Sequence, residues 1–301
     1  MVKADDIFLF VQVVDEGSFS RVAEKLAMTN SVVSKRISRL EQELNVQLFY
    51  RTTRKLNLTE AGHALYGKAR LAKQALQDAQ DTVTGYGDAV RGKIKVTVPV
   101  VSAHVILSRS IAEFCKLYPD VEIELIVTNR MVDIINDGFD LAIRTADLED
   151  SSLIARRLID SRWVVCASPG YIAQHGKPSH PAQLKDHQCL IYKYEGVGPD
   201  NWQFSDQETD FYVQVVGRFH ANSLESIRQA LLNDFGIAYL PQVLIHEDLK
   251  SGRLVPLLDD YAAKNLGVYA VYPRSRQPDK KLNLLVEHFR DAFQHKKEYF
   301  Y

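Results

Sequence analysis

The sequence has few cysteines and no long apolar run, and each absence excludes a class of protein. Its three cysteines, Cys115, Cys166 and Cys189, are widely spaced and form no Cys-x-x-Cys pair. Neither a disulfide framework nor a metal site is therefore expected. No segment is apolar for long enough to cross a membrane, and acidic residues interrupt the apolar stretch of residues 1–16, unlike a signal peptide. We expect a cytoplasmic protein that does not associate with a membrane.

The sequence also lacks the short motifs that mark common enzymes. It contains no Gly-x-Gly-x-x-Gly, no phosphate-binding loop, no nucleophile elbow and no His-Glu-x-x-His. Serine, histidine and aspartate occur, but in no recognisable catalytic arrangement. We therefore expect neither an enzyme nor a bound cofactor.

The composition is that of an ordinary soluble protein of several domains. A chain of 301 residues is long enough for roughly two or three domains. Hydrophobic residues make up 46% and charged residues 25% of it. The formal net charge of −1 neither favours nor excludes binding to nucleic acid, but basic residues predominate locally between Asn30 and Leu58.

The first sixty residues carry the pattern of a helix-turn-helix. Gly17 and Asn45 are suited to the left-handed conformation that ends a helix, and Ser18 and Thr29 are good N-caps. Apolar residues recur at helical spacing in three groups: Ile7, Phe10, Val11 and Val14; Val22, Ala23 and Leu26; and Val33, Ile37, Leu40 and Leu44. Two short helices, a tight turn at residues 27–28 and a third amphipathic helix predict this DNA-binding motif.

The third helix offers a polar face for reading DNA. If its apolar residues point inward, serines and Lys35 point outward, where they suit base edges, and Asn30 suits adenine. After this helix, two apolar triplets flank a basic tip, which predicts a β-hairpin wing that contacts phosphates. The alternative is a simple solvated face. The predicted DNA contacts are Thr29, Asn30, Ser31, Ser34, Lys35, Ser38, Arg39, Arg51, Arg54 and Lys55.

A long helix beginning after Thr59 is predicted to pair two subunits. Its apolar residues alternate at spacings of four and three, as in a coiled coil: Leu65, Ala69, Ala72, Leu76, Ala79 and Val83. The favoured interpretation is pairing with the same helix of a second copy. The alternative is packing against the C-terminal domain of the same chain. Gly85, Gly87 and Gly92 then mark a hinge.

Beyond residue 92 the pattern alternates between strands and helices, which predicts a doubly wound, mainly parallel α/β sheet. Strands are expected at 94–98, 121–128 and 140–144, and helices at 105–118 and 131–137. A second α/β unit begins near Trp163, and the last strand and helix return to the first unit. We expect a DNA-binding domain at 1–60, a linker at 61–91 and an effector domain at 92–301. Its first lobe comprises 92–161 and 267–301 and its second 162–266, with a cleft between them.

Residues 1–62 strongly resemble the N-terminal domain of LysR-type transcriptional regulators. The matching motifs include Gly17-Ser18-Phe19-Ser20 and Leu58-Thr59-Glu60-Ala61-Gly62, and the resemblance continues through residues 138–144, 166–169 and 236–241. It implies a linker-helix homodimer, usually assembled into a tetramer. It also implies a two-lobed effector domain similar to periplasmic binding proteins, and RNA polymerase as a partner if the protein activates transcription. Ala27 and Asn45 stand where this family often has glycine.

An effector site is expected where strands end near helix N-termini. Such ends present free N–H groups and a positive dipole, so a small anion is the expected effector, and the resemblance places the family's effector cleft at these positions. Arg144 could pair with a carboxylate or instead with Asp140, and Ser102 could simply cap a helix. Sensing of pH or redox state through His104, His220 or Cys115 is an alternative. The candidate residues are Val100, Val101, Ser102, Thr128, Asn129, Arg144, His220 and Asn222.

Overall fold

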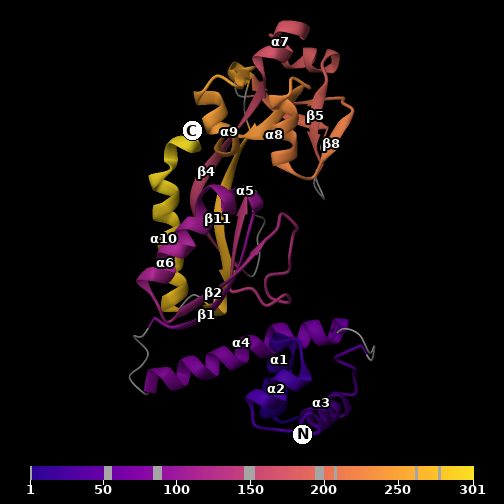
Figure 1. Ribbon diagram of the computed structural model, residues 1–301, viewed down its shortest axis with the longest axis vertical. Coiled ribbons are helices and arrows are strands. Elements are labelled where there is room, and N and C mark those ends of the chain that lie inside the picture. Colours follow the sequence, from indigo (N-terminus) through magenta and orange to yellow (C-terminus); the bar gives the residue numbers. More distant parts are fainter. Residues whose placement is uncertain are drawn as a thin grey trace.

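A computed structural model describes residues 2–50, 56–83, 90–145, 153–193, 200–206, 209–261, 264–276 and 279–301. The chain forms a helical N-terminal module, a long helix and a two-lobed α/β domain, one after another (Figure 1). Within these ranges, none of the helices combines the length and the apolar character needed to cross a membrane.

Three helices make up the N-terminal module: α1 (Ala4–Glu16), α2 (Phe19–Lys25) and α3 (Asn30–Leu44). The Ser18 hydroxyl accepts the Arg21 N–H, and the Thr29 hydroxyl accepts the Val32 N–H, each at 3.4 Å. Gly17 and Asn45 end their helices in the left-handed conformation. The predicted caps are thus confirmed. Ala27 also has a positive φ, of 51°, so the turn keeps the backbone shape that glycine usually provides.

The inward face of α3 packs on α1 largely as predicted. Val33, Ile37 and Leu40 are buried with Phe10, whereas Leu44 is 36% exposed and does not belong to this face. Phe49 and Leu58 form an antiparallel bridge, and the Tyr50 N–H donates to the Asn57 carbonyl at 2.9 Å. These contacts form the base of the predicted wing. Its basic tip, with Arg51, Arg54 and Lys55, lies outside the described residues.

The long helix α4 (Glu60–Val83) begins where expected, because the Thr59 hydroxyl accepts the Gly62 N–H at 3.0 Å. The predicted apolar stripe is divided along its length. Leu65 and Ala69 pack on the N-terminal module, whereas Ala72, Leu76 and Ala79 are exposed. The side chain of Val83 is outside the described set, as are hinge residues Gly85 and Gly87. Pairing of the exposed half with a second copy stays a prediction.

The C-terminal domain is built on a nine-stranded mixed sheet. Its order is β2-β1-β3-β11-β4-β9-β5-β8, and β10 pairs with β4. The strands are β1 (Gly92–Val98), β2 (Val121–Val127), β3 (Leu141–Thr145), β4 (Leu153–Ala167), β5 (Cys189–Tyr192), β8 (Phe219–Ala221), β9 (Ile237–Pro241), β10 (Val255–Leu257) and β11 (Asn265–Pro273). A separate hairpin joins β6 (Asn201–Asp206) to β7 (Thr209–Gln214).

The expectation of a mainly parallel sheet is only partly met. β1 pairs in parallel with β2 and β3, and β5 with β8 and β9. However, β4 and β11 are antiparallel to their neighbours. These two strands run between the lobes instead of being linked by a crossover helix within one lobe, so the rule that such crossovers make strands parallel does not govern them.

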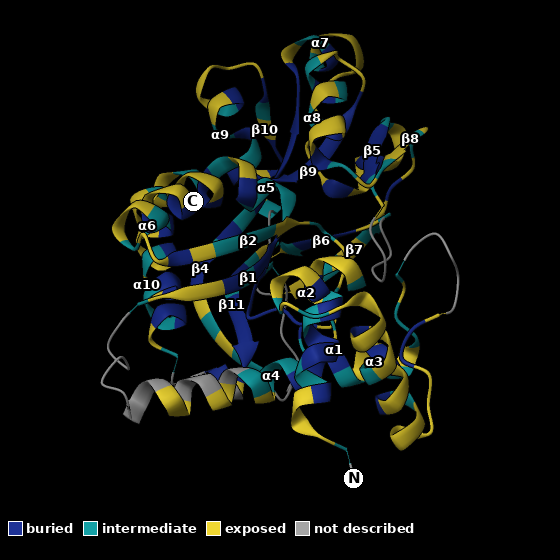
Figure 2. Ribbon diagram, turned by 60° about the horizontal axis from the view of Figure 1, so that its bottom comes forward, coloured by how far each residue is buried: buried dark blue, intermediate teal, exposed yellow. Residues whose placement is uncertain are grey.

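Helices cover both lobes. They are α5 (Val100–Ser102), a π-helix at Ala103–Leu107 and α6 (Ser108–Leu117), which together form one continuous helix, then α7 (Pro169–His175), α8 (Leu224–Leu232), α9 (Gln242–Lys250) and α10 (Lys280–His295). Short 3₁₀ helices lie at Pro181–Asp186, Asp259–Tyr261, Arg274–Arg276 and Lys297–Tyr299. The central strand β9 is buried along its whole length, whereas the edge strand β2 is partly exposed (Figure 2).

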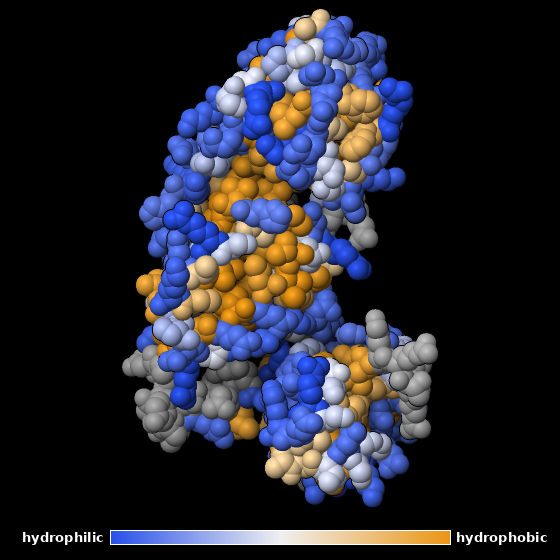
Figure 3. All heavy atoms as spheres, in the orientation of Figure 1, coloured by the Kyte–Doolittle hydropathy of each residue, from blue (hydrophilic) through white to orange (hydrophobic). Residues whose placement is uncertain are grey.

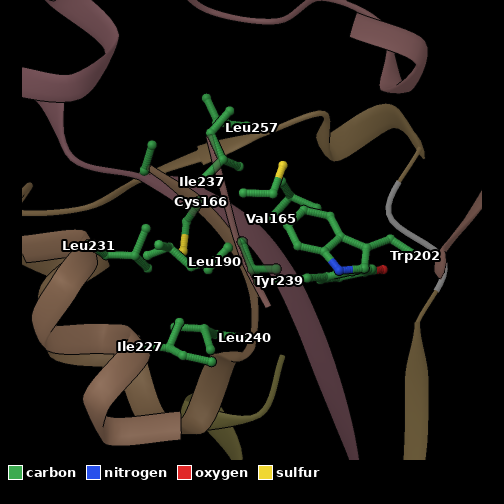
Figure 4. Close-up of a cluster of buried hydrophobic side chains, with 14 of the residues drawn as sticks. Val165, Cys166, Leu190, Trp202, Ile227, Leu231, Ile237, Tyr239, Leu240 and Leu257 are labelled. Carbon is green, nitrogen blue, oxygen red and sulfur yellow. The ribbon is translucent and has the colours of Figure 1, made fainter. Parts of the chain in front are cut away.

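Each lobe has its own hydrophobic core. In the first lobe Val96, Tyr272 and Phe289 are fully buried. In the second lobe Trp202 packs edge-on against Tyr239 of β9 (Figure 4). The first lobe takes its residues from both ends of the domain, so its core closes only when β11 and α10 return to it.

The predicted helix at residues 131–137 is wrong, because side chains there bond to the backbone instead. The Asp133 carboxylate accepts the N–H groups of Ile135 and Asn136 at 3.0 and 2.9 Å, and Asp137 accepts the Asp133 N–H at 3.1 Å. These bonds stabilise turns at the expense of a helix. The segment ends at Gly138, whose φ is 69°.

Candidate DNA-binding face and inter-lobe site

The outer face of α3 consists of small hydroxyls and one amine. Ser31, Ser34, Lys35 and Ser38 are all exposed, because the apolar residues between them hold the opposite side of the helix against α1 (Figure 2). Asn30 is also exposed and donates to the Ser20 hydroxyl at 3.3 Å. The predicted reading face is therefore a free surface with short side chains, which lets a helix approach base edges closely.

Besides Asn30, two further predicted DNA contacts have other bonds within the module. The hydroxyl of Thr29 caps α3. Arg39 pairs with the buried carboxylate of Asp6, as does Arg36, whose Nε lies 2.6 Å from Asp6 Oδ1. Burial raises the pKa of Asp6, but hydrogen bonds from Arg39 and Arg36 outweigh it, so this pKa falls below its usual value. Contact of Arg39 with DNA stays a prediction.

The buried carboxylate was missed in the sequence. Asp6 lies in the first turn of α1. An acidic side chain there is usually exposed to solvent and interacts favourably with the helix dipole. Only the fold shows that two arginines of α3 converge on it. The ion pairs fix the angle at which α3 is presented.

The inter-lobe site is centred on Asn129, which follows β2. Its Oδ1 accepts the Val100 N–H at the start of α5 at 3.0 Å. Its Nδ2 donates to the hydroxyl of Tyr192 at 3.3 Å. Tyr192 ends β5 in the second lobe, so one side chain of the first lobe links a helix N-terminus to the opposite lobe. Val101 packs against the cores of both lobes.

The other candidates of the first lobe are engaged locally. Ser102 lies inside the helix, where Pro99 is the N-cap, so the interpretation of Ser102 as a cap is wrong. The Thr128 hydroxyl accepts the Arg130 N–H at 3.1 Å. Arg144 donates to the Ile143 carbonyl at 2.8 Å and to the Thr97 hydroxyl at 3.4 Å.

On the second lobe, His220 is the middle residue of β8 and Asn222 directly follows the strand, and both are exposed. The His220 ring nitrogen Nε2 lies 3.0 Å from the Gly217 carbonyl oxygen. Ser223 then caps α8. These residues share the carboxyl edge of parallel strands with Tyr192. Tyr192, the second-lobe residue that bonds to Asn129, was not predicted from the sequence, because no local pattern shows that the two lobes meet there.

The burial of the proposed sensor residues His104 and Cys115 differs from that of the other two cysteines. His104 is exposed and Cys115 is half-buried. The other two thiols are fully enclosed, and burial raises the pKa of Cys189 to about 12 and that of Cys166 further still. Thiols in that state are poor nucleophiles.

Two cavities lie in the N-terminal module. One of about 220 Å³ is lined by residues of α1, α2 and α4, including Asp15, Lys25 and Lys73. Another of about 500 Å³ adjoins the base of the wing, next to Phe49 and His63. Both are formed in part by the helices that hold the reading face.

A cluster of charged residues, here called the linker clamp, attaches α4 to the first lobe. It consists of Arg70 on α4, Asp140 at the start of β3 and Arg276 before α10. Both guanidinium groups contact Asp140 Oδ1, and Oδ2 accepts the Lys95 N–H at 2.8 Å. Asp140 was considered as a partner of Arg144, but the arginines that it pairs with are those of the clamp.

The backbone also approaches α4 closely beside the clamp. A Cβ added at Gly67 would lie 2.4 Å from the Ile135 carbonyl oxygen. One added at Gly138 would lie 2.9 Å from Tyr66, whose hydroxyl donates to Asp15 at 2.6 Å. α4 therefore contacts the first lobe of its own chain, but through Gly67, Tyr66 and Arg70 and not through the apolar stripe, so the alternative interpretation of the stripe stays a prediction.

Comparisons with known proteins cover nearly the whole chain. The model described as "Bacterial regulatory helix-turn-helix protein, lysR family" matches residues 4–63, and "LysR substrate binding domain" matches 87–294. The transcriptional regulator CrgA of Neisseria meningitidis is 35% identical over 96% of this chain and 95% of its own. Its solved structure has a TM-score of 0.60 at 34% identity, over 96% and 99% of the two chains. The full-length virulence activator AphB of Vibrio cholerae gives 0.61 at 30% identity, over 96% and 98%.

Proposed function

The chain belongs to the LysR family of transcriptional regulators, and on that premise we propose that α3 reads a specific operator under the control of a small anionic effector. Its relatives are named as transcriptional regulators and not as enzymes. The proposed location is the cytoplasm, where the DNA is. RNA polymerase is a further partner if the protein activates transcription.

The exposed row of Ser31, Ser34, Lys35 and Ser38 carries the proposal for α3. Serine hydroxyls accept or donate, and a lysine amine donates to guanine O6 and N7. This row has no packing role in the module, since the buried residues of α3 lie on the other side. Side chains that neither pack nor form ion pairs are available for a partner.

Operator binding tests this assignment. DNA that co-purifies with the protein supplies the operator, and fluorescence anisotropy measures affinity. Ser34→Ala and Lys35→Ala should each weaken specific binding by about 5- to 150-fold, at about 1–3 kcal/mol for a good base contact. Lys185→Ala, which removes an exposed lysine of the second lobe, is the matched control and should change nothing. Unchanged affinity in both α3 variants would refute the reading face.

We propose that a second copy of the chain covers the exposed half of α4. Leu76 is 50% exposed between Ala72 and Ala79, and small residues let two helices approach closely. A second apolar surface is available for assembly into a tetramer. It includes the exposed side chains of Ile126 and Val127 on the edge strand β2. Figure 3 shows an apolar region at the middle of the molecule.

Sedimentation velocity separates the two contacts. Leu76→Glu should remove the α4 contact and Val127→Glu the β2 contact, so each variant should halve the mass of a tetramer. The two together should give monomers. A Leu76→Glu variant of unchanged mass would refute pairing through α4.

The effector is proposed to bind beside Val100 and Asn129. The free N–H groups and positive dipole of a helix N-terminus favour an anion, and the helix beginning at Val100 continues to Leu117. Asn129 already fills one of these N–H positions. A carboxylate effector would replace its amide oxygen and release Tyr192.

Asn129→Asp tests the charge of the effector. The new carboxylate keeps the cap on Val100 but repels a second negative charge. We expect calorimetry to show loss of binding for every small carboxylate or phosphate that binds the wild-type protein. Asn233→Asp, at the exposed C-terminal end of α8, is the control for a general change of charge. An anion that binds wild type and Asn129→Asp equally well would exclude this position.

A further inference from the structure

The side chain of Val32 is apolar and exposed in the first turn of α3. It is 42% exposed, and it belongs neither to the buried core of the N-terminal module nor to the partly buried side chains that pack on that core. The next residue, Val33, is fully buried. The N–H of Val32 donates to the Thr29 hydroxyl, which fixes its backbone at the start of the helix. Among the described residues, the two methyl groups of Val32 therefore do not contribute to the core of the module.

The stability of α3 does not account for a valine at this position either. β-Branched residues are weaker helix formers than alanine, glutamate or lysine, because the helix restricts their side chains. An acidic side chain in the first turn would interact favourably with the helix dipole, but α3 has none there. A side chain that neither packs in the module nor favours the helix is available for a partner.

The surroundings of Val32 indicate that this partner is DNA. Ser31 precedes Val32 and Lys35 follows it by one turn, and both are exposed on the face proposed to read the operator. With no acidic side chain in the first turn of α3, no carboxylate of that turn opposes a nearby phosphate. A single valine among polar and basic side chains is also too small for an apolar contact with a protein, which needs a contiguous patch.

We propose that Val32 is a specificity-determining residue that contacts the 5-methyl group of a thymine in the operator. Like the proposed function on which it rests, this contact requires α3 to lie in the major groove. Thymine is the only one of the four bases that presents a methyl group there. A helix holds the valine side chain in one rotamer about 90% of the time, so the contact costs little conformational entropy.

The position of the thymine follows from the geometry of the helix. Residues three apart have Cβ atoms about 5–6 Å apart, and successive bases of a strand are about 3.4 Å apart. The thymine should therefore lie about one or two base pairs from the base that Lys35 contacts.

Replacing thymine by uracil tests the contact, because it removes the methyl group and leaves the hydrogen-bonding groups of the base unchanged. The probe is the operator that co-purifies with the full-length protein, in which each thymine is replaced in turn by deoxyuridine. Fluorescence anisotropy measures the affinity. At one position in each half-site, uracil should weaken binding of the wild-type protein by about fourfold, the value of one apolar carbon removed from water.

Three variants assign this loss to Val32. Val32→Ala should bind the thymine operator about fourfold more weakly than wild type, and uracil at that position should weaken it no further. Ser34→Ala loses a hydrogen bond and not a methyl contact, so it should keep the fourfold loss on uracil. Val46→Ala is the matched control and should keep it too, because it removes a 40% exposed valine beyond the opposite end of α3. Alanine is a better helix former than valine, so Val32→Ala should fold as wild type does.

The outcomes separate this contact from the proposed function. Suppose that the wild type binds the operator specifically, but that no uracil replacement weakens binding, or that uracil weakens Val32→Ala as much as wild type. The contact of Val32 with thymine is then refuted, while α3 still reads the operator. A wild-type protein that binds the operator no better than random DNA would refute the reading of DNA itself, and the contact with it.

Discussion

Replacing Asp140 by Asn should weaken the first lobe far more than the loss of an ordinary surface charge. Asp140 is 3% exposed and faces two guanidinium groups, those of Arg70 and Arg276. Asn keeps the size of the side chain and can still accept the Lys95 N–H. It removes the only negative charge that Arg70 contacts among the described residues, whereas Arg276 keeps Asp279. Leaving a buried charge unpaired costs about 3–5 kcal/mol, and the retained partner points to about 3 kcal/mol.

Hydrogen exchange is the appropriate assay, because both tryptophans, Trp163 and Trp202, lie in the second lobe and their fluorescence does not report on the first. The Asp140 N–H donates to the Lys95 carbonyl at 2.9 Å. Exchange of peptides that span β1 and β3 should accelerate by about a hundredfold in Asp140→Asn, since each 1.4 kcal/mol is about a factor of ten.

The matched control is Asp160→Asn, which breaks the exposed pair with Arg157 on β4. Such pairs contribute little to stability, so exchange in β1 and β3 should stay as in wild type. Equal acceleration in the two variants would refute the idea that the clamp is important because it is buried. Acceleration confined to β9 and α8 would equally contradict it, since these elements belong to the other lobe.

Three further predictions follow from single positions. Ala27→Gly should stabilise the N-terminal module by about 1 kcal/mol, because φ there is 51°, and an unchanged urea midpoint would contradict this. Gly67→Ala should separate α4 from the first lobe, since its Cβ would approach the Ile135 carbonyl oxygen too closely. The variant should then be cleaved faster between α4 and β1 in limited proteolysis, and a cleavage rate equal to that of wild type would contradict this. Lys264→Met should be more stable than wild type at pH 7. In the wild type burial lowers the folded pKa to about 8, below the ordinary value, so charging the amine destabilises the folded state at low pH, and this cost disappears as pH rises from about 8 to about 10.5. The urea midpoint of the variant should therefore exceed that of wild type by less and less between about pH 8 and about pH 10.5. A difference that does not depend on pH would contradict the lowered pKa of Lys264.

Features set by a few neighbouring residues could be predicted from the sequence. Ser18, Thr29 and Asn45 act on backbone groups within three or four positions, so their residue types determine what they do. The same short range explains the error at 131–137. Its apolar spacing suited a helix, but Asp133 bonds to the N–H groups two and three residues later, and such competition does not appear in a count of apolar positions.

Contacts between distant residues could not be predicted in this way. Asn129 and Tyr192 are 63 positions apart, and Arg70 and Asp140 are 70 positions apart. Each of these side chains has an ordinary local setting, and its role arises from how the two lobes and α4 are assembled. The candidate effector residues were found on general grounds, at strand ends near helix N-termini, but their partners across the lobes required the fold.

The first lobe is formed by two separate segments of the chain, and this affects the order in which the lobes can fold during synthesis. The second lobe draws nearly all of its core from one unbroken stretch, between Trp163 and Leu258. The first lobe needs Tyr272, Phe289 and Phe300, which are synthesised after the second lobe. The second lobe can therefore fold while the first lobe still lacks β11 and α10 and has an open sheet edge. Chains truncated before α10 should accordingly expose the incomplete core of the first lobe, and chaperones and proteases should act on them there.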